Sequence, residues 1–109
     1  MDLEKRLQMC LLLDFYGNLL TEKQRDIVHM YYENDSSLTE IGEIFGISRQ
    51  GVRDALKVSE NLLIDFEQKL NFIAKHNDIK NAINVIINNV DNITYEEAIC
   101  ELKKLYNNL

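Results

Sequence analysis

The chemically most suggestive residues of this chain are cations at helical spacing near its middle. On a helix that begins near residue 49, a turn of 100° per residue places Arg49, Arg53 and Lys57 within one quadrant. Cations in such a stripe can hold phosphates, and polar side chains beside them can meet base edges in a groove. The candidate nucleic-acid-binding residues are Ser48, Arg49, Gln50, Arg53 and Lys57.

The same stripe has a simpler interpretation as a solvated helix face. Asp54 could pair with Arg53 or with Lys57. Three positive charges give a weak electrostatic footprint, and the whole chain is acidic, with 12 Lys and Arg against 18 Asp and Glu and a net charge of −6. The sequence leaves both interpretations open.

No other group of residues predicts chemistry. His29 and His76 have no neighbours at metal-ligand spacing. The sequence has no glycine-rich phosphate loop, no Cys-x-x-Cys pair, no Ser/His/Asp set and no convergent pair of carboxylates. We therefore expect a protein that is not an enzyme and that needs no metal or other cofactor.

Length and composition predict a small globular protein of the cytoplasm. The chain has 109 residues, 46% of them hydrophobic, which suffices for a modest core. Cys10 and Cys100 lie among apolar neighbours, as reduced thiols do in a reducing compartment. The early apolar run, residues 9–13, is far shorter than the roughly 20 residues of a membrane span. We expect a soluble protein without membrane insertion.

Apolar periodicity predicts an all-α fold, because the chain has no proline, only 4 glycines and apolar residues at i, i+3, i+4 spacing nearly throughout. Helices are expected over residues 2–16, from Thr21, over residues 37–45, and from Ser48 to about His76. Residues 1–76 then form a helix-turn-helix domain without a wing and with a long fourth helix. Residues 77–109 form a C-terminal helical hairpin, which we expect to pack on the same core.

The helix-turn-helix prediction depends on the short connection Gly46-Ile47 between the third and fourth helices. Gly42 is small enough for a close crossing, and Gly46 can adopt the left-handed conformation of a turn. Apolar side chains that would pin the two helices are Ile41, Phe45, Ile47, Val52 and Leu56. For Gly51, inside the recognition helix, we favour tight crossing against the preceding helix over close approach to a nucleic acid.

Two apolar stripes predict a homodimer. The first helix carries one stripe of Leu3, Leu7, Cys10, Leu11 and Phe15, widened by further apolar residues. The long helix carries a seam with coiled-coil spacing, formed by Val52, Leu56, Ser59, Leu63, Phe66, Leu70 and Ile73. The alternative is that the C-terminal hairpin of the same chain covers both stripes.

Three segments resemble a known family: Leu-Thr-Glu-Lys-Gln-Arg at residues 20–25, Ser-Leu-Thr-Glu-Ile-Gly-Glu at residues 37–43, and Ile-Ser-Arg-Gln-Gly-Val-Arg-Asp at residues 47–54. Together they resemble the YlxM-like family of small bacterial helix-turn-helix proteins, over roughly residues 3–72. The first segment and the Ser-Arg-Gln turn are also similar to region 4 of sigma factors, which reads promoters.

The resemblance implies a regulatory role in the signal recognition particle pathway, because genes of this family neighbour that of the particle's targeting GTPase. It implies the particle's RNA or its GTPase as partner. It also places Ser48, Arg49, Gln50 and Arg53 at the start of the recognition helix. Two alternatives stay open: a DNA-binding transcription regulator, and a protein-interaction adaptor in which the helix-turn-helix is only a scaffold.

Overall fold

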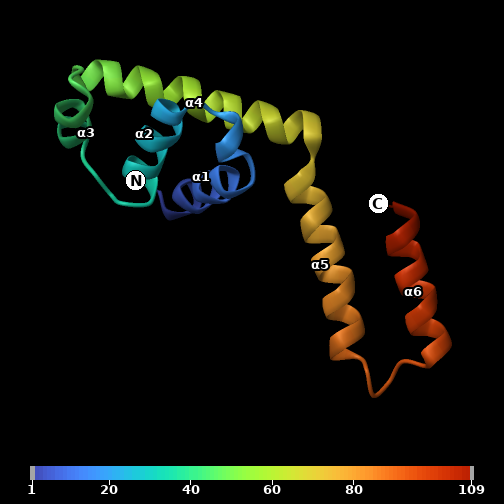
Figure 1. Ribbon diagram of the computed structural model, residues 1–109. Coiled ribbons are helices and arrows are strands. Elements are labelled where there is room, and N and C mark those ends of the chain that lie inside the picture. The colour runs from blue at the N-terminus through green and yellow to red at the C-terminus, as the bar shows by residue number, and fades with distance from the viewer. Residues whose placement is uncertain (1, 109) are drawn as a thin grey trace. The chain divides into compact units, whose positions relative to one another are not determined.

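The computed structural model describes residues 2–108, which form helices and connecting turns without a β-strand (Figure 1). The predicted all-α class is confirmed. The helices are α1 (Leu3–Tyr16), α2 (Glu22–Tyr32), α3 (Leu38–Phe45), α4 (Arg49–Leu70), α5 (Phe72–Asn88) and α6 (Tyr95–Asn108), with a short 3₁₀ helix η1 (Gly17–Leu19) after α1. The chain divides into two compact units, the first ending at Asn71 and the second beginning at Phe72.

Side-chain caps begin the helices where the sequence predicts them. The Thr21 hydroxyl accepts from the Gln24 N–H at 3.2 Å, and the Gln24 side chain accepts from the Thr21 N–H at 3.0 Å. Ser37 and Glu40 repeat this capping box at the start of α3. Each box satisfies two backbone donors that a helix start would otherwise leave unpaired.

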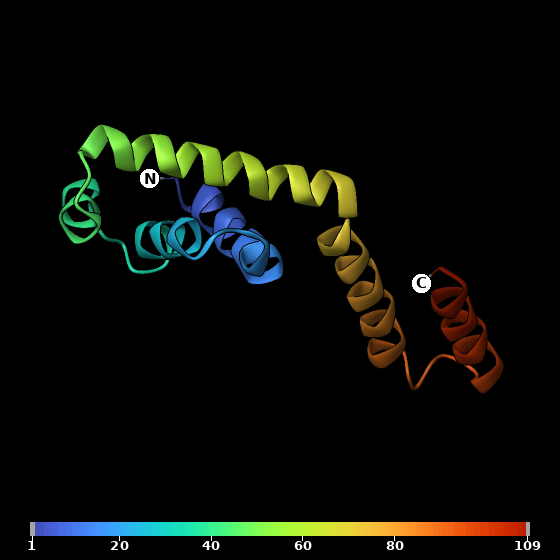
Figure 2. The same cartoon turned by 45° about the horizontal axis from the view of Figure 1, so that its top comes forward.

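The core of the first unit lies where α1, α2 and α3 pack along one side of α4 (Figures 1 and 2). Its largest fully buried side chains come from all four helices: Tyr16, Ile27, Val28, Tyr32, Ile41, Val52, Ser59 and Leu63. Ser59 is the polar member of the predicted seam, and its hydroxyl donates to the Ala55 carbonyl at 2.8 Å. The seam of α4 from Val52 to Leu63 is thus covered by helices of its own chain.

Helix α1 buries a different face from the predicted one. Its buried residues are Met9, Leu12, Leu13 and Tyr16, whereas Leu3, Leu7 and Leu11 are 67%, 62% and 41% exposed. Periodicity could not select the buried face, because apolar residues surround most of this helix. Ile44 of α3 is likewise apolar and 64% exposed.

Helix α4 ends six residues before the expected position near His76. Asn71 adopts a left-handed conformation with φ of +56°, and its N–H donates to the Glu67 carbonyl at 2.8 Å. Asparagine tolerates this conformation better than most residues do, so it can end a helix without glycine. The sequence did not predict this helix end, because the apolar repeat continues across it into α5, which starts at Phe72.

The second unit is a hairpin in which α5 packs against α6. Within residues 72–108, no side chain of either helix is fully buried. Cys100 in α6 is exposed and Cys10 in α1 is half-buried, and both thiols are free. Cys100 therefore lacks the burial that is typical of a structural thiol. No helix in the described part of the chain is both long and apolar enough to cross a membrane.

Candidate nucleic-acid interface

The connection between α3 and α4 has helix-turn-helix geometry. Gly46 adopts φ of +67°, the left-handed conformation that glycine takes without steric cost. The N–H groups of Gly46 and Ile47 both donate to the Gly42 carbonyl. Gly42 is buried, and a Cβ at this position would come within 3.6 Å of the Val52 side chain. The predicted roles of Gly42 and Gly46 are thus confirmed.

Gly51 is small for a reason that differs from the predicted one. A Cβ at Gly51 would come within 3.3 Å of the Ser48 hydroxyl and 3.5 Å of the Ile47 Cβ, and no atom of α3 is among its nearest neighbours. The Gly51 N–H also donates to the Ser48 hydroxyl at 3.0 Å. Gly51 therefore makes room for the turn and for the cap of α4, not for a helix crossing.

Arg49, Arg53 and Lys57 form an exposed line along α4, which we call the basic ridge. Successive members are four residues apart, about 6 Å along the axis, so they share one side of the helix. Val52 and Leu56, whose mean direction lies about 80° around the helix from that of the ridge, are buried as the prediction required.

No described acidic side chain neutralises the cations of the basic ridge. Within residues 2–108, none of its three side chains makes a hydrogen bond or an ion pair. Asp54, which could have neutralised Arg53 or Lys57, instead accepts from the Gln50 amide at 2.9 Å. The pairing of Asp54 with a ridge cation is therefore absent, and the ridge keeps its charge available for an anion.

The remaining predicted site residues lie beside the ridge with their own contacts. Ser48 caps α4, so its oxygen is occupied by the Gly51 N–H while its hydroxyl hydrogen stays available as a donor. Gln50 is exposed and tied to Asp54. The structure thus gathers Arg49, Arg53 and Lys57 on one face and leaves Ser48 and Gln50 at its edge.

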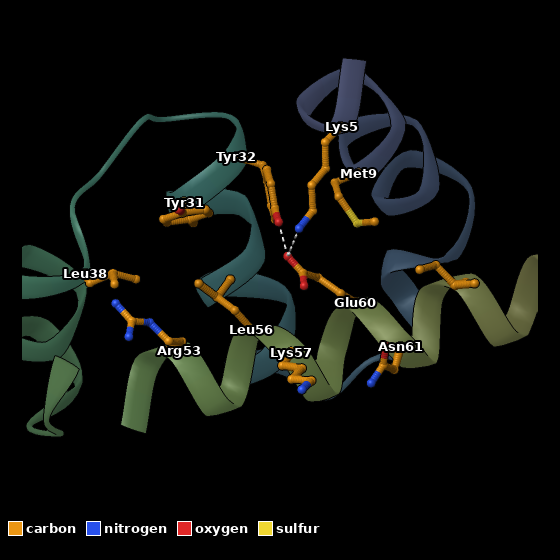
Figure 3. A pocket seen from close by; sticks show the side chains of 11 residues that line it. Lys5, Met9, Tyr31, Tyr32, Leu38, Arg53, Leu56, Lys57, Glu60 and Asn61 are labelled. Atoms are coloured by element: carbon orange, nitrogen blue, oxygen red, sulfur yellow. Dashed lines mark hydrogen bonds and ion pairs between the residues drawn. The ribbon is translucent and has the colours of Figure 1, made fainter. Parts of the chain in front are cut away.

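A hollow that the sequence did not predict lies between α1, α2 and α4, with Leu38 at the start of α3 also lining it (Figure 3). Arg53 and Lys57 line it together with Lys5, Tyr31 and Glu60, and its volume is about 510 Å³. The signal available in the sequence is weak: Glu60 lies three residues after Lys57, hence on nearly the same side of α4. Its partners on α1 and α2 are distant in the chain.

Glu60 is the acidic residue that lines this hollow, and it interacts with both Tyr32 and Lys5. The Tyr32 hydroxyl donates to Glu60 Oε1, and Lys5 Nζ lies 3.9 Å from the same oxygen (Figure 3). Burial raises the pKa of the Glu60 carboxyl, and the nearby Lys5 ammonium partly opposes that rise. The three residues connect α1, α2 and α4 through one carboxylate.

The other titratable residues that the structure describes form no comparable site. His29 Nδ1 pairs with Glu33 one turn later on α2. Across residues 2–108, no three His, Cys, Asp or Glu side chains are grouped so that they could hold a metal ion.

Comparison with known proteins matches most of the chain to one family. Residues 3–105 match UPF0122, the family described as "Putative helix-turn-helix protein, YlxM / p13 like". The match includes most of the second unit, which the three motifs did not reach.

Individual relatives support the same match. A UPF0122 protein of Thermoanaerobacter sp. (strain X514) is 48% identical over 97 residues, covering 89% of this chain and 83% of the relative. A relative from Caldanaerobacter subterraneus is 56% identical over 78 residues, covering 72% and 67% of the two chains. One from Halalkalibacterium halodurans is 42% identical over 104 residues, covering 94% and 95%.

Proposed function

The chain belongs to the YlxM/p13-like family of helix-turn-helix proteins, and from this membership we propose that it is a non-enzymatic, cytoplasmic regulatory component of the signal recognition particle pathway. It acts by binding nucleic acid through the basic ridge of α4. Its ligand is the RNA of the particle, alone or together with the targeting GTPase. The link to the particle rests on the family resemblance, and the nucleic-acid contact rests on the site.

The single observation that carries the binding mode is that the three cations of the basic ridge are aligned and unneutralised. In a protein of net charge −6, attraction to phosphate has to be local, because the overall field opposes it. Arg49, Arg53 and Lys57 supply that local field on the exposed side of the recognition helix. Phosphate contacts from these residues would set the register of α4, and Gln50 and Ser48 at its edge could reach bases or sugars.

The test compares the wild-type chain with the Arg53→Ala, Lys57→Ala double variant. Each tagged protein is used to capture partners from bacterial lysate, and captured RNA, DNA and protein are identified before and after nuclease treatment. We expect the wild type to retain the particle's RNA and the double variant to lose it. A Lys103→Ala, Lys104→Ala variant is the matched control, because it removes the same charge from α6 and should keep the RNA.

Two results would contradict the proposal. Retention of the RNA by the double variant would show that the basic ridge is not the binding surface. Capture of genomic DNA instead of the particle's RNA would make the protein a transcription regulator, with two recognition helices about 34 Å apart in a dimer.

A homodimer is part of the proposal, and the structure changes where its interface should be sought. The seam of α4 is covered between Val52 and Leu63, which leaves the exposed line of Leu3, Leu7 and Leu11 on α1. Removing such leucines from water is favourable, at about 25 cal/mol per Å² of apolar surface. We propose that α1 of one protomer packs against α1 of the other.

The protein-interaction adaptor is the second candidate, and the same line of leucines favours it. In that case the apolar face of α1 receives another protein, and the helix-turn-helix serves as scaffold. Salt distinguishes the two functions, because an apolar interface responds little to ionic strength whereas phosphate binding weakens steeply.

A further inference from the structure

The hollow between α1, α2 and α4 offers more chemistry than phosphate binding by the basic ridge requires. Its volume of about 510 Å³ falls within the usual range of small-ligand sites, roughly 300–1,000 Å³. Three cations line it: Arg53 and Lys57 from the ridge, and Lys5 from α1. An anionic group that follows the ridge would therefore reach the opening of this hollow.

Tyr31 gives the hollow an aromatic wall. Its ring is half-exposed and meets the buried Tyr32 ring edge-on, with centroids 4.9 Å apart and planes at 89°. Because Tyr32 is fixed in the core, this contact holds the Tyr31 ring in place beside the hollow (Figure 3). An aromatic ring held in this way can stack on a nucleic-acid base, and stacking accepts any base.

Glu60 adds a hydrogen-bond acceptor on the opposite wall. Its Oε1 is shared by the Tyr32 hydroxyl and the Lys5 ammonium, whereas Oε2 has no partner among residues 2–108. The side chain is 17% exposed, and Oε2 itself is open to solvent, so a ligand can reach this oxygen. An N–H donor from a ligand would satisfy it, as the amino groups of adenine, cytosine and guanine could.

We propose that this hollow binds one nucleoside phosphate, supplied by an unpaired nucleotide of the bound RNA. The base stacks on Tyr31 with its amino group toward Glu60, and the phosphate lies between Arg53 and Lys57. Unpaired bases are presented by loops and bulges of RNA and can be read on their edges, whereas a base inside a duplex cannot enter such a hollow. Uracil fits less well, because the one donor on its pairing edge, N3–H, lies between two carbonyl oxygens that the Glu60 carboxylate would repel. This inference rests on the proposed function, since the basic ridge brings the RNA to the hollow.

The experiment measures binding of the full chain to three RNA hairpins of one sequence by fluorescence anisotropy. One is fully paired, one has a single bulged adenosine and one has a single bulged uridine. We expect the bulged adenosine to tighten binding about fivefold or more over the paired hairpin, and the bulged uridine to tighten it less. Titration with adenosine monophosphate alone tests whether a free nucleotide occupies the same site.

Variants at Tyr31 locate the effect. Tyr31→Ala should abolish the preference for the bulged adenosine while binding of the paired hairpin stays the same, which also shows that the protein is folded. Tyr31→Phe should keep the preference, because it keeps the ring. Tyr95→Ala is the matched control, since Tyr95 is an exposed tyrosine of α6 outside the hollow.

Each other outcome decides against part of the inference. Equal affinity for all three hairpins with no binding of adenosine monophosphate overturns the site and leaves the proposed function intact. A bulge preference that survives Tyr31→Ala places the unpaired nucleotide elsewhere. Binding of adenosine monophosphate through Tyr31 without a bulge preference assigns the hollow to a free nucleotide and overturns the RNA source. Failure of every hairpin to bind contradicts the proposed function itself.

Discussion

The Cα of Gly42 lies so close to the helix-turn-helix connection that a Cβ there would sit 2.6 Å from the carbonyl oxygen of Ile47. The neighbouring atom is backbone, so it cannot move aside as a flexible side chain would. The carbonyl oxygen of Gly42 also accepts hydrogen bonds from the N–H groups of Gly46 and Ile47. The approach of α3 to the start of α4 is therefore set by the absence of a side chain at this residue.

Replacing Gly42 by alanine should destabilise the protein. We expect Gly42→Ala to lower the free energy of unfolding by about 1–3 kcal/mol, because the extra methyl group forces the turn away from α3. Urea denaturation followed by circular dichroism measures the change. Glu43→Ala is the control, since Glu43 is exposed on the same helix, and it should change stability by less than about 0.5 kcal/mol. Equal stability of Gly42→Ala and wild type would contradict the packing described for this turn.

The helix-turn-helix could be predicted because its signals are local. Ser37 and Ser48 cap the helices that follow them, and Gly46 ends α3 in the left-handed conformation. Each of these features depends on residues within one turn of the chain, so spacing alone identifies it.

The features that could not be predicted depend on contacts between distant residues. The buried face of α1 is selected by α2 and α4, and periodicity could not choose among apolar residues on nearly every side. Glu60 meets Tyr32 and Lys5 across 28 and 55 residues, as the numbering shows, so no spacing rule connects them. The end of α4 at Asn71 lacks the glycine or proline that would have marked it.

Two substitutions of Ser48 should separate its contribution to helix capping from its contribution to nucleic-acid binding. Ser48→Ala removes the acceptor of the Gly51 N–H and should cost about 0.5–2 kcal/mol of stability. Ser48→Asp keeps an acceptor and places a negative charge where the helix dipole favours it, so stability should be retained. The same aspartate repels phosphate beside the basic ridge, and RNA affinity should fall. Thermal unfolding measures the change in stability, and fluorescence anisotropy on the same preparations measures the change in RNA affinity. Unchanged RNA affinity in Ser48→Asp would place the phosphate contacts away from the start of α4.

Glu60 should make stability depend on pH. Burial raises its pKa in the folded protein above the ordinary value near 4.5, so the folded state binds this proton more readily than the unfolded state. The stabilisation from protonation is complete below the unfolded pKa and is lost as pH rises through the folded pKa. Glu60→Gln keeps an acceptor for the Tyr32 hydroxyl and cannot titrate.

The measurement is the free energy of unfolding from urea titrations at several pH values, compared between wild type and Glu60→Gln. We expect the wild type to become less stable relative to the variant as pH rises above 4.5. Subtracting one protein from the other removes the contribution of the remaining carboxylates. A constant difference across this range would show that the Glu60 pKa is the same in both states.

The salt dependence of RNA affinity should give the number of phosphates that the basic ridge neutralises. Each lost phosphate contact lowers the slope of log affinity against log salt by about 1, so the Arg53→Ala, Lys57→Ala variant should lose about 2. Anisotropy titrations between low and moderate salt give the slope. Lys103→Ala, Lys104→Ala is again the matched control, and its slope should equal that of the wild type. Wild-type binding that is independent of salt would favour the adaptor over the nucleic-acid-binding protein.

The exposed leucines of α1 predict where the dimer can be broken. Leu7 lies between Leu3 and Leu11 on the exposed line, and a charge there would have to be buried in the proposed interface between two copies of α1. We expect the wild type to have twice the 12.8 kDa mass of one chain in light scattering at micromolar concentration, and Leu7→Glu to have the mass of one.

Val58→Glu is the control for this interface, because Val58 is a similarly exposed apolar residue on α4, 53% against 62% for Leu7. It should leave the mass unchanged. Dissociation by Val58→Glu but not by Leu7→Glu would move the interface to α4. A wild-type mass of one chain would refute the dimer and leave the α1 face open to a different protein, which is the surface that the adaptor function requires.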